Sequence, residues 1–356
     1  MPNEIIIAAA GGGKTTRIVQ RSLADPRRRV ALVTYTNNNV SELHKRFYDI
    51  GPVVPVHVEI WSWYRFLLHE MVRPYQSVLL PRRVEGVHFV EGRSAPYAKK
   101  TDIDRHYLSE GGRLVFSDKI SELVLVLNAA SKGAVIARLK LRFATVFIDE
   151  VQDMAGYDLE LLELLLRAGI DIVLVGDHRQ ATFSTNNSSK NKAFAGSKII
   201  GKLRIWQEAG LADLTFERET HRCHQMVANL ADAFFPNEPA TISRNTVITG
   251  HDGVFLVRRA GVANYVAQFN PQVLRLNRRT NCDDLAAMNF GDSKGLTFNR
   301  VLIFPHKKGE LWLKTGDFSH VEASAAKLYV GITRARHSVA FVFDGASSLK
   351  GISRYE

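Results

Sequence analysis

The stretch EIIIAAAGGGKT, residues 4–15, decides the fold of this chain. Its first part is an apolar run rich in isoleucine, as expected for a buried strand, and residues 14–23 have a helical pattern that ends before Pro26. Gly11, Gly12 and Gly13 join the strand to the helix. A strand, a glycine-rich loop and a helix that opens with Lys and Thr are typical of a loop that binds phosphate groups.

The chemistry of such a loop predicts a role for its residues. Backbone N–H groups of the loop converge on an anion, and the helix N-terminus adds partial positive charge. We expect Lys14 to reach the β- and γ-phosphates of a nucleotide and the Thr15 hydroxyl to bind Mg²⁺. The predicted nucleotide-binding residues are Gly11, Gly12, Gly13, Lys14, Thr15 and Thr16. Ala8 stands where the usual spacing has a glycine, and the alternative is a glycine-rich turn with a chance lysine.

The alternation of strands and helices continues along the chain. Short apolar runs at 30–34, 54–60, 144–148 and 171–175 alternate with helical stretches. A second series lies at 214–216, 253–257, 273–276, 300–304 and 339–343. This pattern is typical of parallel sheets covered by helices on both faces. We therefore predict two α/β units, residues 1–212 and 213–356, with residues 66–140 as a small insertion in the first.

An acidic pair behind a predicted strand is a second candidate element of the nucleotide site. Asp149 and Glu150 follow the apolar run 144–148, so they lie at the carboxyl edge of a sheet, where open α/β folds bind ligands. We expect Asp149 to hold Mg²⁺ and Glu150 to orient and deprotonate the attacking water. Alone, the pair is equally typical of a surface turn. Together with the glycine loop it indicates nucleoside triphosphate hydrolysis.

Composition restricts the classes of protein. The 356 residues exceed twice the usual domain length of about 150, and 47 Lys and Arg against 36 Asp and Glu give a net charge of +11, which is compatible with a polyanionic partner. Cys223 and Cys282 are too few for a disulfide framework. No apolar run reaches the roughly 20 residues that span a bilayer, and the N-terminus lacks the pattern of a signal peptide. We expect a cytoplasmic protein with no membrane partner.

Further segments carry a more specific signal when they are taken in order. They are TYTNN (34–38), WSWYRFLL (61–68), DEVQD (149–153), VGDHRQATF (175–183), ETHR (219–222), SKGLTF (293–298) and LYVGITRAR (328–336). With the glycine loop, this series resembles the motifs of the superfamily 1 helicases of the UvrD/Rep/PcrA kind. The resemblance implies a fold of two RecA-like parallel-sheet domains and a motor that uses ATP and Mg²⁺.

The resemblance also implies roles for residues outside the glycine loop. Gln180 would sense the γ-phosphate, Arg222 and Arg334 would be arginine fingers, and Gly295 would belong to the nucleotide site; with Glu150, the first three form the implied catalytic set. An arginine finger neutralises charge that develops in the transition state. The alternative for both arginines is a solvated or salt-bridged surface position. A metal site at residues 221–224 is not expected, because one thiol and two imidazoles in a single turn lack ligand geometry.

A track for one nucleic-acid strand follows from the same resemblance. Tyr35 and Phe183 align with aromatic residues that stack on bases, and Thr36, Asn37 and Trp63 are further candidates. Lys190 and Lys192 belong to a segment, residues 190–204, that holds five basic residues and no acid, and residues 132–142 show the same bias. Aromatic faces stack on bases, and basic side chains bind phosphates. The alternatives are aromatic residues of the core and lysines of a solvated surface.

Departures from the family pattern bear on function. The family's adenine-reading glutamine segment has no counterpart before the first strand, and Thr297 stands where many relatives have a ribose-facing glutamate. We therefore expect weak discrimination between ATP and other nucleotides. The stretch between Arg222 and Ser293 is too short for the large helical insertion of full-size relatives.

We predict an NTP-dependent translocase or helicase that moves 3′ to 5′ on single-stranded DNA, or at a junction with duplex, and unwinds weakly without a protein partner. A nuclease or a replication factor would be such a partner. The alternative is a nucleotide-gated DNA-binding subunit that regulates a nuclease, replication or defence complex. A small-molecule P-loop kinase would leave the segments 175–183 and 328–336 without a role.

Overall fold

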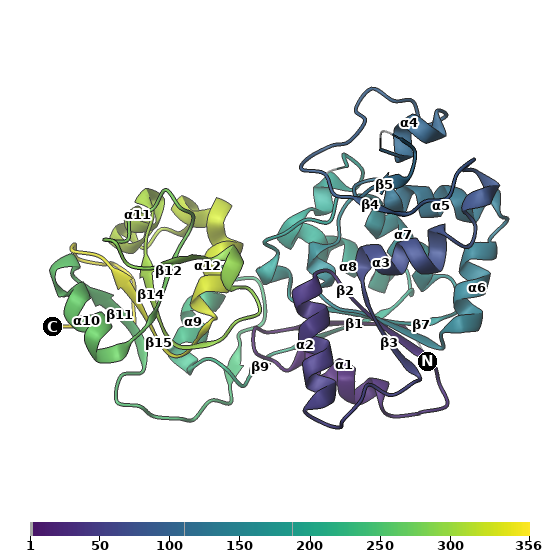
Figure 1. Cartoon of the computed structure of the whole chain (residues 1–356). Helices are drawn as coiled ribbons and strands as arrows, with labels where there is room; N and C mark the ends of the chain where they lie inside the picture. The colour runs from purple at the N-terminus through teal and green to yellow at the C-terminus, as the bar shows by residue number, and fades with distance from the viewer. Residues whose placement is uncertain (1–2, 110, 187) are drawn as a thin grey trace. The chain divides into compact units, whose positions relative to one another are not determined.

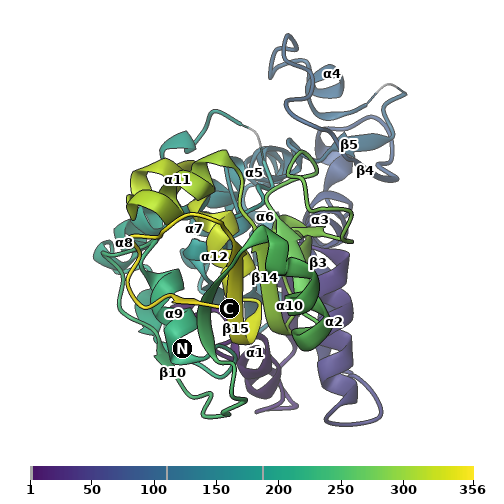
Figure 2. The same ribbon diagram turned by 90° about the vertical axis from the view of Figure 1, so that its left-hand side faces the viewer.

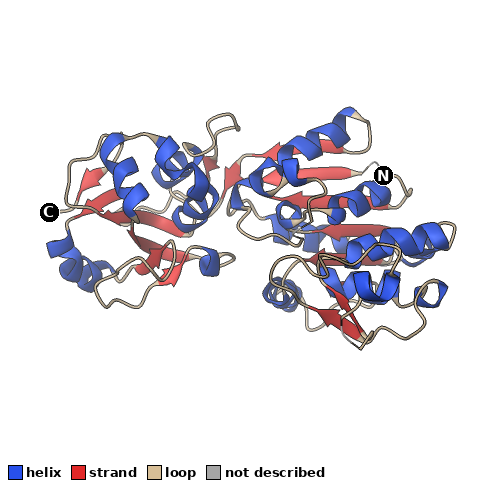
Figure 3. Cartoon of the chain, turned by 90° about the horizontal axis from the view of Figure 1, so that it is seen from above, coloured by secondary structure: helices blue, strands red, loops and turns tan. Residues whose placement is uncertain are grey.

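The structure, a computed structural model, describes residues 3–109, 111–186 and 188–356. Its contacts divide the chain into two units. The first contains the residues up to Ile7, Lys14–His178 and Phe183–Thr215, and the second contains Ala8–Gly13, Arg179–Thr182 and Phe216–Glu356. Each unit is built around a six-stranded parallel sheet with helices on both faces (Figure 1, Figure 3). The predicted α/β class, with two RecA-like parallel-sheet domains, is confirmed.

The strands of the first sheet lie in the order β3, β2, β6, β7, β1 and β8. Their bounds are β3 Val58–Ser62, β2 Val30–Thr34, β6 Thr145–Ile148, β7 Asp171–Gly176, β1 Glu4–Ala8 and β8 Asp213–Glu217. All residues of β2 and β6 are buried, as expected for central strands with helices on both faces. Because β7 lies between β1 and β6 and pairs in parallel with both, the chain leaves β1 toward Lys14 at the same edge at which it leaves β6 toward Asp149.

Helices that follow these strands cover the sheet. They are α1 Lys14–Ser22, α2 Asn37–Tyr48, the short α3 Trp63–Phe66, α7 Tyr157–Leu166 and α8 Ile199–Glu208. Ile18, Val19 and Phe47 from α1 and α2 pack with Leu32 and Phe147 of the sheet. Burial of this apolar face stabilises the helices on the sheet.

The predicted strand 54–60 begins four residues too early. The structure has β3 at Val58–Ser62, because the apolar residues before it lie in an exposed loop. Val53 is 67% and Val56 94% exposed, and the Val58 N–H donates to the carbonyl oxygen of Pro55. Pro55 shapes this turn, since it has no N–H to donate to a sheet.

The segment between α3 and β6 has its own small elements. Three of them, β4, β5 and α4, lie together beyond one end of the sheet (Figure 1, Figure 2). The elements are a π-helical turn Leu67–Val72, β4 Gly86–His88, α4 Ile103–Tyr107, β5 Leu114–Phe116, α5 Ile120–Ala130 and α6 Ala134–Arg142. Helix α4 lies within the predicted insertion 66–140, and the Asp102 side chain caps it by accepting from the Arg105 N–H. Helix α5 packs against α7 and the π-helical turn.

The second sheet has the strand order β13, β12, β14, β15, β11 and β16. Its strands are β13 Met288–Asn289, β12 Gln272–Arg275, β14 Phe298–Phe304, β15 Ala335–Val342, β11 Gly253–Val257 and β16 Ser353–Arg354, and its helices are α9 Gln225–Asp232, α10 Val262–Phe269, α11 Lys307–Thr315 and α12 Ala325–Ile332. A separate parallel pair is formed by β9 Glu219–Thr220 and β10 Ile242–Ser243.

Two apolar clusters on the two faces of this sheet stabilise the second unit. Ile303 and Phe341 belong to one cluster, while their neighbours Leu302, Phe304 and Ala340 belong to the other. Side chains of a strand point alternately to opposite faces, so both faces are buried and the strand sequence is apolar throughout.

Within the described residues, no single helix has the length and hydropathy that crossing a membrane requires; the pair α5 and α6, bent by 102°, passes that test on length and composition when taken together.

Candidate nucleotide site and nucleic-acid interface

The glycine loop between β1 and α1 requires glycine for two reasons. Gly11 has φ +78° and Gly13 has φ +76°, which is the left-handed region that other residues rarely adopt. A Cβ on Gly11 would also lie 2.5 Å from Cβ of Arg222 and 2.8 Å from the Thr220 hydroxyl. A Cβ on Gly12 would lie 2.9 Å from the carbonyl oxygen of Glu219. The loop therefore leaves no room for side chains next to the segment 219–222.

Direct hydrogen bonds hold the loop against that segment. The Thr220 hydroxyl donates to the carbonyl oxygen of Ala10 at 2.6 Å, and the His221 N–H donates to the carbonyl oxygen of Gly11 at 3.1 Å. These residues all belong to the second unit. The structure thus brings the predicted Gly11 and Arg222 together, and Thr220, to which the sequence assigned no role, is a support for the loop.

Lys14, Thr15 and Thr16 form the first turn of α1. All three are partly exposed, and the helix N-terminus they form favours an anion. The Thr16 hydroxyl accepts a hydrogen bond from Nη1 of Arg46 at 2.8 Å. That contact directs Thr16 toward α2 and gives its hydroxyl a structural partner.

The acidic pair lies at the carboxyl end of β6. The Asp149 side chain is buried and accepts from the N–H of Glu150 at 2.9 Å. Glu150 has φ +59°, a strained conformation of the kind that is often found at functional sites. Carboxylate and hydroxyl oxygens are the ligands that Mg²⁺ prefers, so Asp149 and Thr15 fit a magnesium ion by the chemistry of their donors.

Gln152, to which the sequence assigned no role, connects the acidic pair to the neighbouring strand. Its side-chain Nε2 donates to the carboxylate of Glu150, and its side-chain Oε1 accepts from the N–H of Asp177 at 3.0 Å. Gln152 is fully buried, and a Cβ on Gly176 would overlap its side-chain oxygen. The position of Glu150 is therefore fixed from the end of β7.

The second unit brings Gln180, Arg222 and Arg334 together. Arg334 is 1% exposed, and its Nη2 donates to Oε1 of Gln180 at 2.9 Å. Its Nε and Nη1 donate to the carbonyl oxygens of Val330 and Leu296 at 3.0 and 3.2 Å. A surface position, the alternative for Arg334, is wrong because this side chain is buried.

Thr333 links the two arginines. Nη1 of Arg222 donates to the carbonyl oxygen of Thr333 at 3.1 Å, and the Thr333 hydroxyl accepts from Nη2 of Arg334 at 3.3 Å. The thiol of Cys223 also donates to that carbonyl, and burial raises its pKa. Gly295, in contrast, is exposed, with φ +87° and no atom within 4 Å of a Cβ position.

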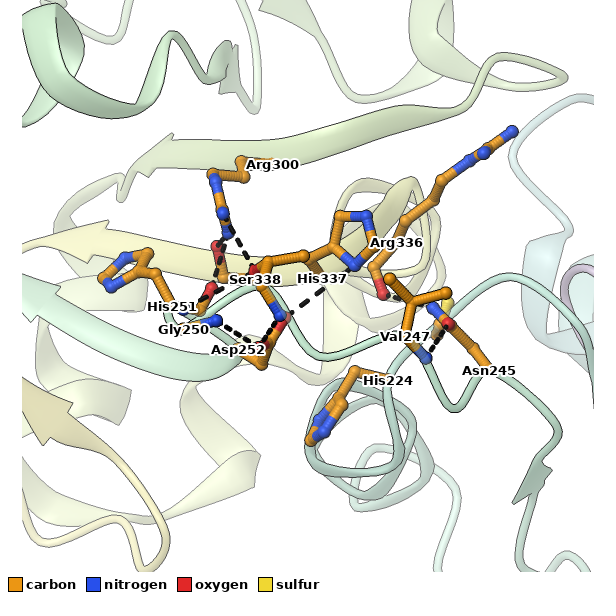
Figure 4. A network of polar contacts seen from close by, with 12 residues as sticks. His224, Asn245, Val247, Gly250, His251, Asp252, Arg300, Arg336, His337 and Ser338 are labelled. Carbon is orange, nitrogen blue, oxygen red and sulfur yellow. Dashed lines mark hydrogen bonds and ion pairs between the residues drawn. The ribbon is translucent and has the colours of Figure 1, made fainter.

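Asn245 holds the backbone around Arg222. Figure 4 shows Asn245 beside Arg336, its other partner. The side-chain amide of Asn245 donates to the carbonyl oxygens of Arg222 at 2.8 Å and Arg336 at 3.0 Å, and the N–H of His224 donates to the same oxygen of Arg336 at 2.7 Å. The segment after Arg222 is thereby attached to β15. No sequence signal identified Asn245, because its partners lie 23 and 91 residues away.

A buried histidine lies beside this network. The ring of His251 is stacked between Phe255 and Phe269, with centroids 3.8 and 3.9 Å away, and its Nε2 is 2.9 Å from the hydroxyl of Tyr265. Burial, together with the nearby charge of Arg300, lowers the pKa of His251 to about 4. The ring is therefore neutral at pH 7.

The predicted strand-contact residues differ in exposure. Phe183 is 42% exposed, Asn37 is exposed at the start of α2, and Tyr35 is half-buried with its ring 6.0 Å from that of Tyr64. The hydroxyl of Thr36 caps α2 by accepting from the N–H of Asn39 at 3.1 Å. Phe183 and Asn37 are thus accessible to solvent, whereas Thr36 caps α2.

Trp63 is wrongly predicted as a stacking residue. It is fully buried in this structure, and its indole N–H donates to the buried carboxylate of Asp158 at 3.1 Å. A ring packed on all sides has no face for a base. Asp158 also accepts from the hydroxyls of Ser121 and Thr185, so Trp63 belongs to a buried polar cluster.

Acids from other segments neutralise much of the predicted basic surface. Lys190 lies 3.6 Å from Glu160, and Lys202 donates to Glu163 at 2.8 Å, which lowers the pKa of Glu163 to about 2. Similarly, Arg138 and Arg142 pair with Glu70 at 3.0 and 3.2 Å. Lys192 is exposed. The local absence of acids in the sequence therefore overstated the charge of these segments.

Two protein families match this chain. Residues 2–186 match the family described as an AAA domain, and residues 132–343 match the viral superfamily 1 RNA helicase core domain. The chain belongs to superfamily 1 of the helicases. This membership agrees with the predicted resemblance at the level of the superfamily. In a superfamily 1 chain, the glycine loop is a P-loop.

Individual relatives are more distant. The superfamily 1 chain is 26% identical over 137 residues to the RecBCD enzyme subunit RecB of Borreliella burgdorferi, a match that covers 36% of this chain and 11% of RecB. Among solved structures, the helicase nonstructural protein 10 of an arterivirus, in complex with DNA, shows 14% identity and a TM-score of 0.49, with coverage of 96% of this chain and 60% of that one. The same helicase in a second structure shows 13% identity and a TM-score of 0.48. The chain thus spans about a tenth of RecB and about three fifths of the arterivirus protein.

Proposed function

We propose that this chain hydrolyses ATP and uses the energy to move 3′ to 5′ along single-stranded DNA, as a compact relative of the UvrD/Rep/PcrA helicases. One observation carries the proposal. A strained Glu150 next to a buried Asp149 lies at the same sheet edge as Lys14, and a separate cluster joins Gln180, Arg222 and Arg334. Hydrolysis of a nucleoside triphosphate needs these kinds of group: a phosphate cradle, a metal ligand, a base and cations for the developing charge.

Each group has a proposed task. The loop N–H groups and Lys14 bind the β- and γ-phosphates, Thr15 and Asp149 bind Mg²⁺, and Glu150 orients the attacking water and accepts its proton. When bound, Mg²⁺ neutralises charge on the phosphate oxygens. Gln152 keeps the Glu150 carboxylate in place through its hydrogen bond, so Glu150 loses little freedom when it acts.

Gln180 and the two arginines are proposed to respond to the γ-phosphate. In this structure the guanidinium of Arg334 donates to the side chain of Gln180 and to backbone oxygens. We propose that a triphosphate draws Arg334 and Arg222 into hydrogen bonds in which donor and acceptor carry opposite charges, which adds an attraction that a neutral acceptor lacks. Gln180 then loses its hydrogen bond from Arg334 and binds the γ-phosphate in its place, and this exchange couples hydrolysis to movement.

Strand binding is proposed to rest on stacking more than on lysines. Phe183 and Tyr35 supply aromatic faces, and Asn37 supplies an exposed amide near Tyr35 in the sequence. Of the two predicted lysines, Lys192 is exposed, whereas Lys190 lies beside Glu160. Stacking contributes about 1–3 kcal/mol per base and depends little on base identity.

We also propose that the functional boundary between the domains lies near residue 212, close to the point where the chain passes to the second unit at Phe216. The partial match to RecB, a subunit of the RecBCD enzyme, favours a second candidate: a subunit that binds DNA under nucleotide control within a nuclease complex and unwinds little by itself. A cytoplasmic location is supported by the two buried free thiols, Cys223 and Cys282, because thiols stay reduced there.

ATP hydrolysis should be measured alone and with single-stranded DNA or RNA, for the wild type and for Lys14→Ala. We expect stimulation by DNA in the wild type and loss of hydrolysis in Lys14→Ala, with Lys45→Ala, an exposed lysine of α2, as the matched control. Displacement of streptavidin from a labelled 5′ end, and not from a 3′ end, identifies 3′ to 5′ stepping. DNA-stimulated hydrolysis without displacement at either end favours the regulatory subunit, and the absence of hydrolysis refutes both.

A further inference from the structure

A cavity of about 350 Å³ in the first unit is lined by none of the proposed nucleotide or strand residues except Lys190. It lies where the chain enters α5, and Ser188 and Ser189 also line it. The charged residues that line it are Arg93, Lys100, Asp118, Lys119, Glu122 and Lys190. Cavities of this size accommodate small ligands or one functional group of a larger one.

Lys119 gives this cavity its character. It immediately precedes α5 and is only 6% exposed. Among residues 3–109, 111–186 and 188–356, its ammonium has no hydrogen bond and no ion pair within 4 Å. Burial lowers the pKa of Lys119, although Asp118 and Glu122 act in the opposite direction. Lys119 lines the cavity, so an anion there would give its ammonium a partner.

The two acids of the cavity already have partners. Glu122 accepts from Lys100 at 2.5 Å and lies 3.3 Å from Nε2 of His106. Asp118 accepts from the N–H and the hydroxyl of Ser94 at 3.0 and 2.5 Å. Neither carboxylate therefore satisfies Lys119 by direct contact.

The remaining charge is positive. The described part of the chain gives the exposed Arg93 no ion pair, and Lys190 lies 3.6 Å from Glu160 on the other side. Lys119 immediately precedes α5, whose first turn also holds Glu122. Lys119 and Arg93 together outweigh the carboxylate of Asp118, whose partner Ser94 is neutral, and so favour an anion in the cavity.

We propose that this cavity binds a phosphomonoester, separately from the glycine loop. Such a group carries a charge of about −1.5 to −2 at pH 7, and Lys119 and Arg93 together outweigh the carboxylate of Asp118 by one positive charge to attract it. Arginine binds two phosphate oxygens through its planar fork, and lysine acts as a point charge. The phosphate is either the end of a nucleic-acid strand or a free phosphate, and the two sources share this chemistry. The proposal is independent of hydrolysis at the glycine loop.

Calorimetric titration with inorganic phosphate tests the site in the full chain. All titrations use the Lys14→Ala background, which weakens phosphate binding at the glycine loop. Lys119→Met and Arg93→Met remove each charge but keep an apolar stem, and Lys99→Met removes the charge of a nearby exposed lysine as the control. We expect the first two to weaken phosphate binding about tenfold to hundredfold, because each removes charge-assisted bonds, and the control to leave it unchanged.

A second titration identifies the source. An oligonucleotide that ends in a phosphate is compared with the same oligonucleotide ending in a hydroxyl. Tighter binding of the phosphorylated strand, lost in Lys119→Met, identifies a strand end; equal binding of the two strands, while free phosphate still binds, identifies a free phosphate. The proposal is overturned if the Lys14→Ala chain binds no phosphate, or if Arg93→Met and Lys119→Met leave the binding unchanged. Arg93 lies on the exposed rim, so its variant decides the matter if Lys119→Met does not fold.

Discussion

Replacing Asn245 with alanine should lower kcat for ATP hydrolysis about tenfold. The Asn245 amide donates to the carbonyl oxygens of Arg222 and Arg336 at 2.8 and 3.0 Å, and so fixes the backbone of the proposed arginine finger on β15. Each bond contributes about 0.5–1.5 kcal/mol net. Since Asn245 is only half-buried, we take about 1–2 kcal/mol for the pair. About 1.4 kcal/mol of transition-state stabilisation corresponds to a factor of ten in rate.

The assay is steady-state hydrolysis with the separation of kcat from KM. Because Arg222 is proposed to act on charge that develops in the transition state, kcat should fall while KM changes little. Asn245→Asp is the sharper variant, since it keeps the shape but turns the donor into an acceptor that faces two carbonyl oxygens. Asn277→Ala is the matched control: Asn277 is an exposed asparagine of the same unit, and its side chain accepts from the N–H of Arg279, two residues away.

A double-mutant cycle separates positioning from general loosening of the fold. In an Arg222→Ala background, the further change Asn245→Ala should leave single-turnover hydrolysis unaltered, because the group that Asn245 positions is gone. An equal fall in both backgrounds would refute the reasoning. So would an unchanged kcat for Asn245→Ala and Asn245→Asp in the wild-type background.

Three further predictions concern the glycine loop, the base and a buried histidine. Gly11→Ala should weaken ATP binding more than Gly13→Ala does. Both glycines have a left-handed φ, but only a Cβ on Gly11 would lie 2.5 Å from Arg222. Equal effects of the two variants in a nucleotide-binding titration would contradict the clash. Glu150→Gln should lower single-turnover hydrolysis by about 10²–10⁴ while ATP binding is retained, and hydrolysis at the wild-type rate would remove Glu150 from the role of base. The pKa of His251, lowered to about 4 from 6.5, means that its contribution to stability is complete above pH 6.5 and is lost as the pH falls from 6.5 to 4. His251→Phe keeps the stacking on Phe255 and Phe269 but removes the titrating group. In urea unfolding, the free energy of unfolding of the wild type should therefore fall between pH 7 and pH 5 by about 1 kcal/mol more than that of His251→Phe, after allowance for solvent screening. An identical fall in the two proteins would show that His251 does not titrate in this way.

The parts of the site that are set by residues adjacent in the sequence could be predicted from the sequence. The glycine loop and the acidic pair each follow an apolar strand directly, so the strand fixes where they lie at the sheet edge. Trp63 could not be predicted in this way. Aromatic residues occur at 61, 63, 64 and 66, and the pattern does not tell which of them turn toward the core. Its hydrogen bond to Asp158 joins residues 95 positions apart.

Charge was mispredicted for a related reason. Residues 190–204 contain no acid, yet Glu160 and Glu163 of α7 lie beside Lys190 and Lys202. Ion pairs between helices depend on packing, which a local count of charges does not include. The same limit applies to Asn245 and Thr333, whose hydrogen bonds join segments that the chain brings together only after folding.

The acceptors around Arg334 bear on how a nucleotide could recruit it. Four acceptors of Arg334, on Gln180, Leu296, Val330 and Thr333, are neutral, and because the guanidinium donor is charged, each bond contributes about 1.5–3 kcal/mol. A phosphate oxygen adds its own negative charge to such a bond. The gain from exchanging one of these four acceptors for a phosphate oxygen is therefore the added attraction between opposite charges. Because Arg222 shares Thr333 with Arg334, withdrawal of either arginine breaks a bond on the residue that holds the other, and the two are expected to move together.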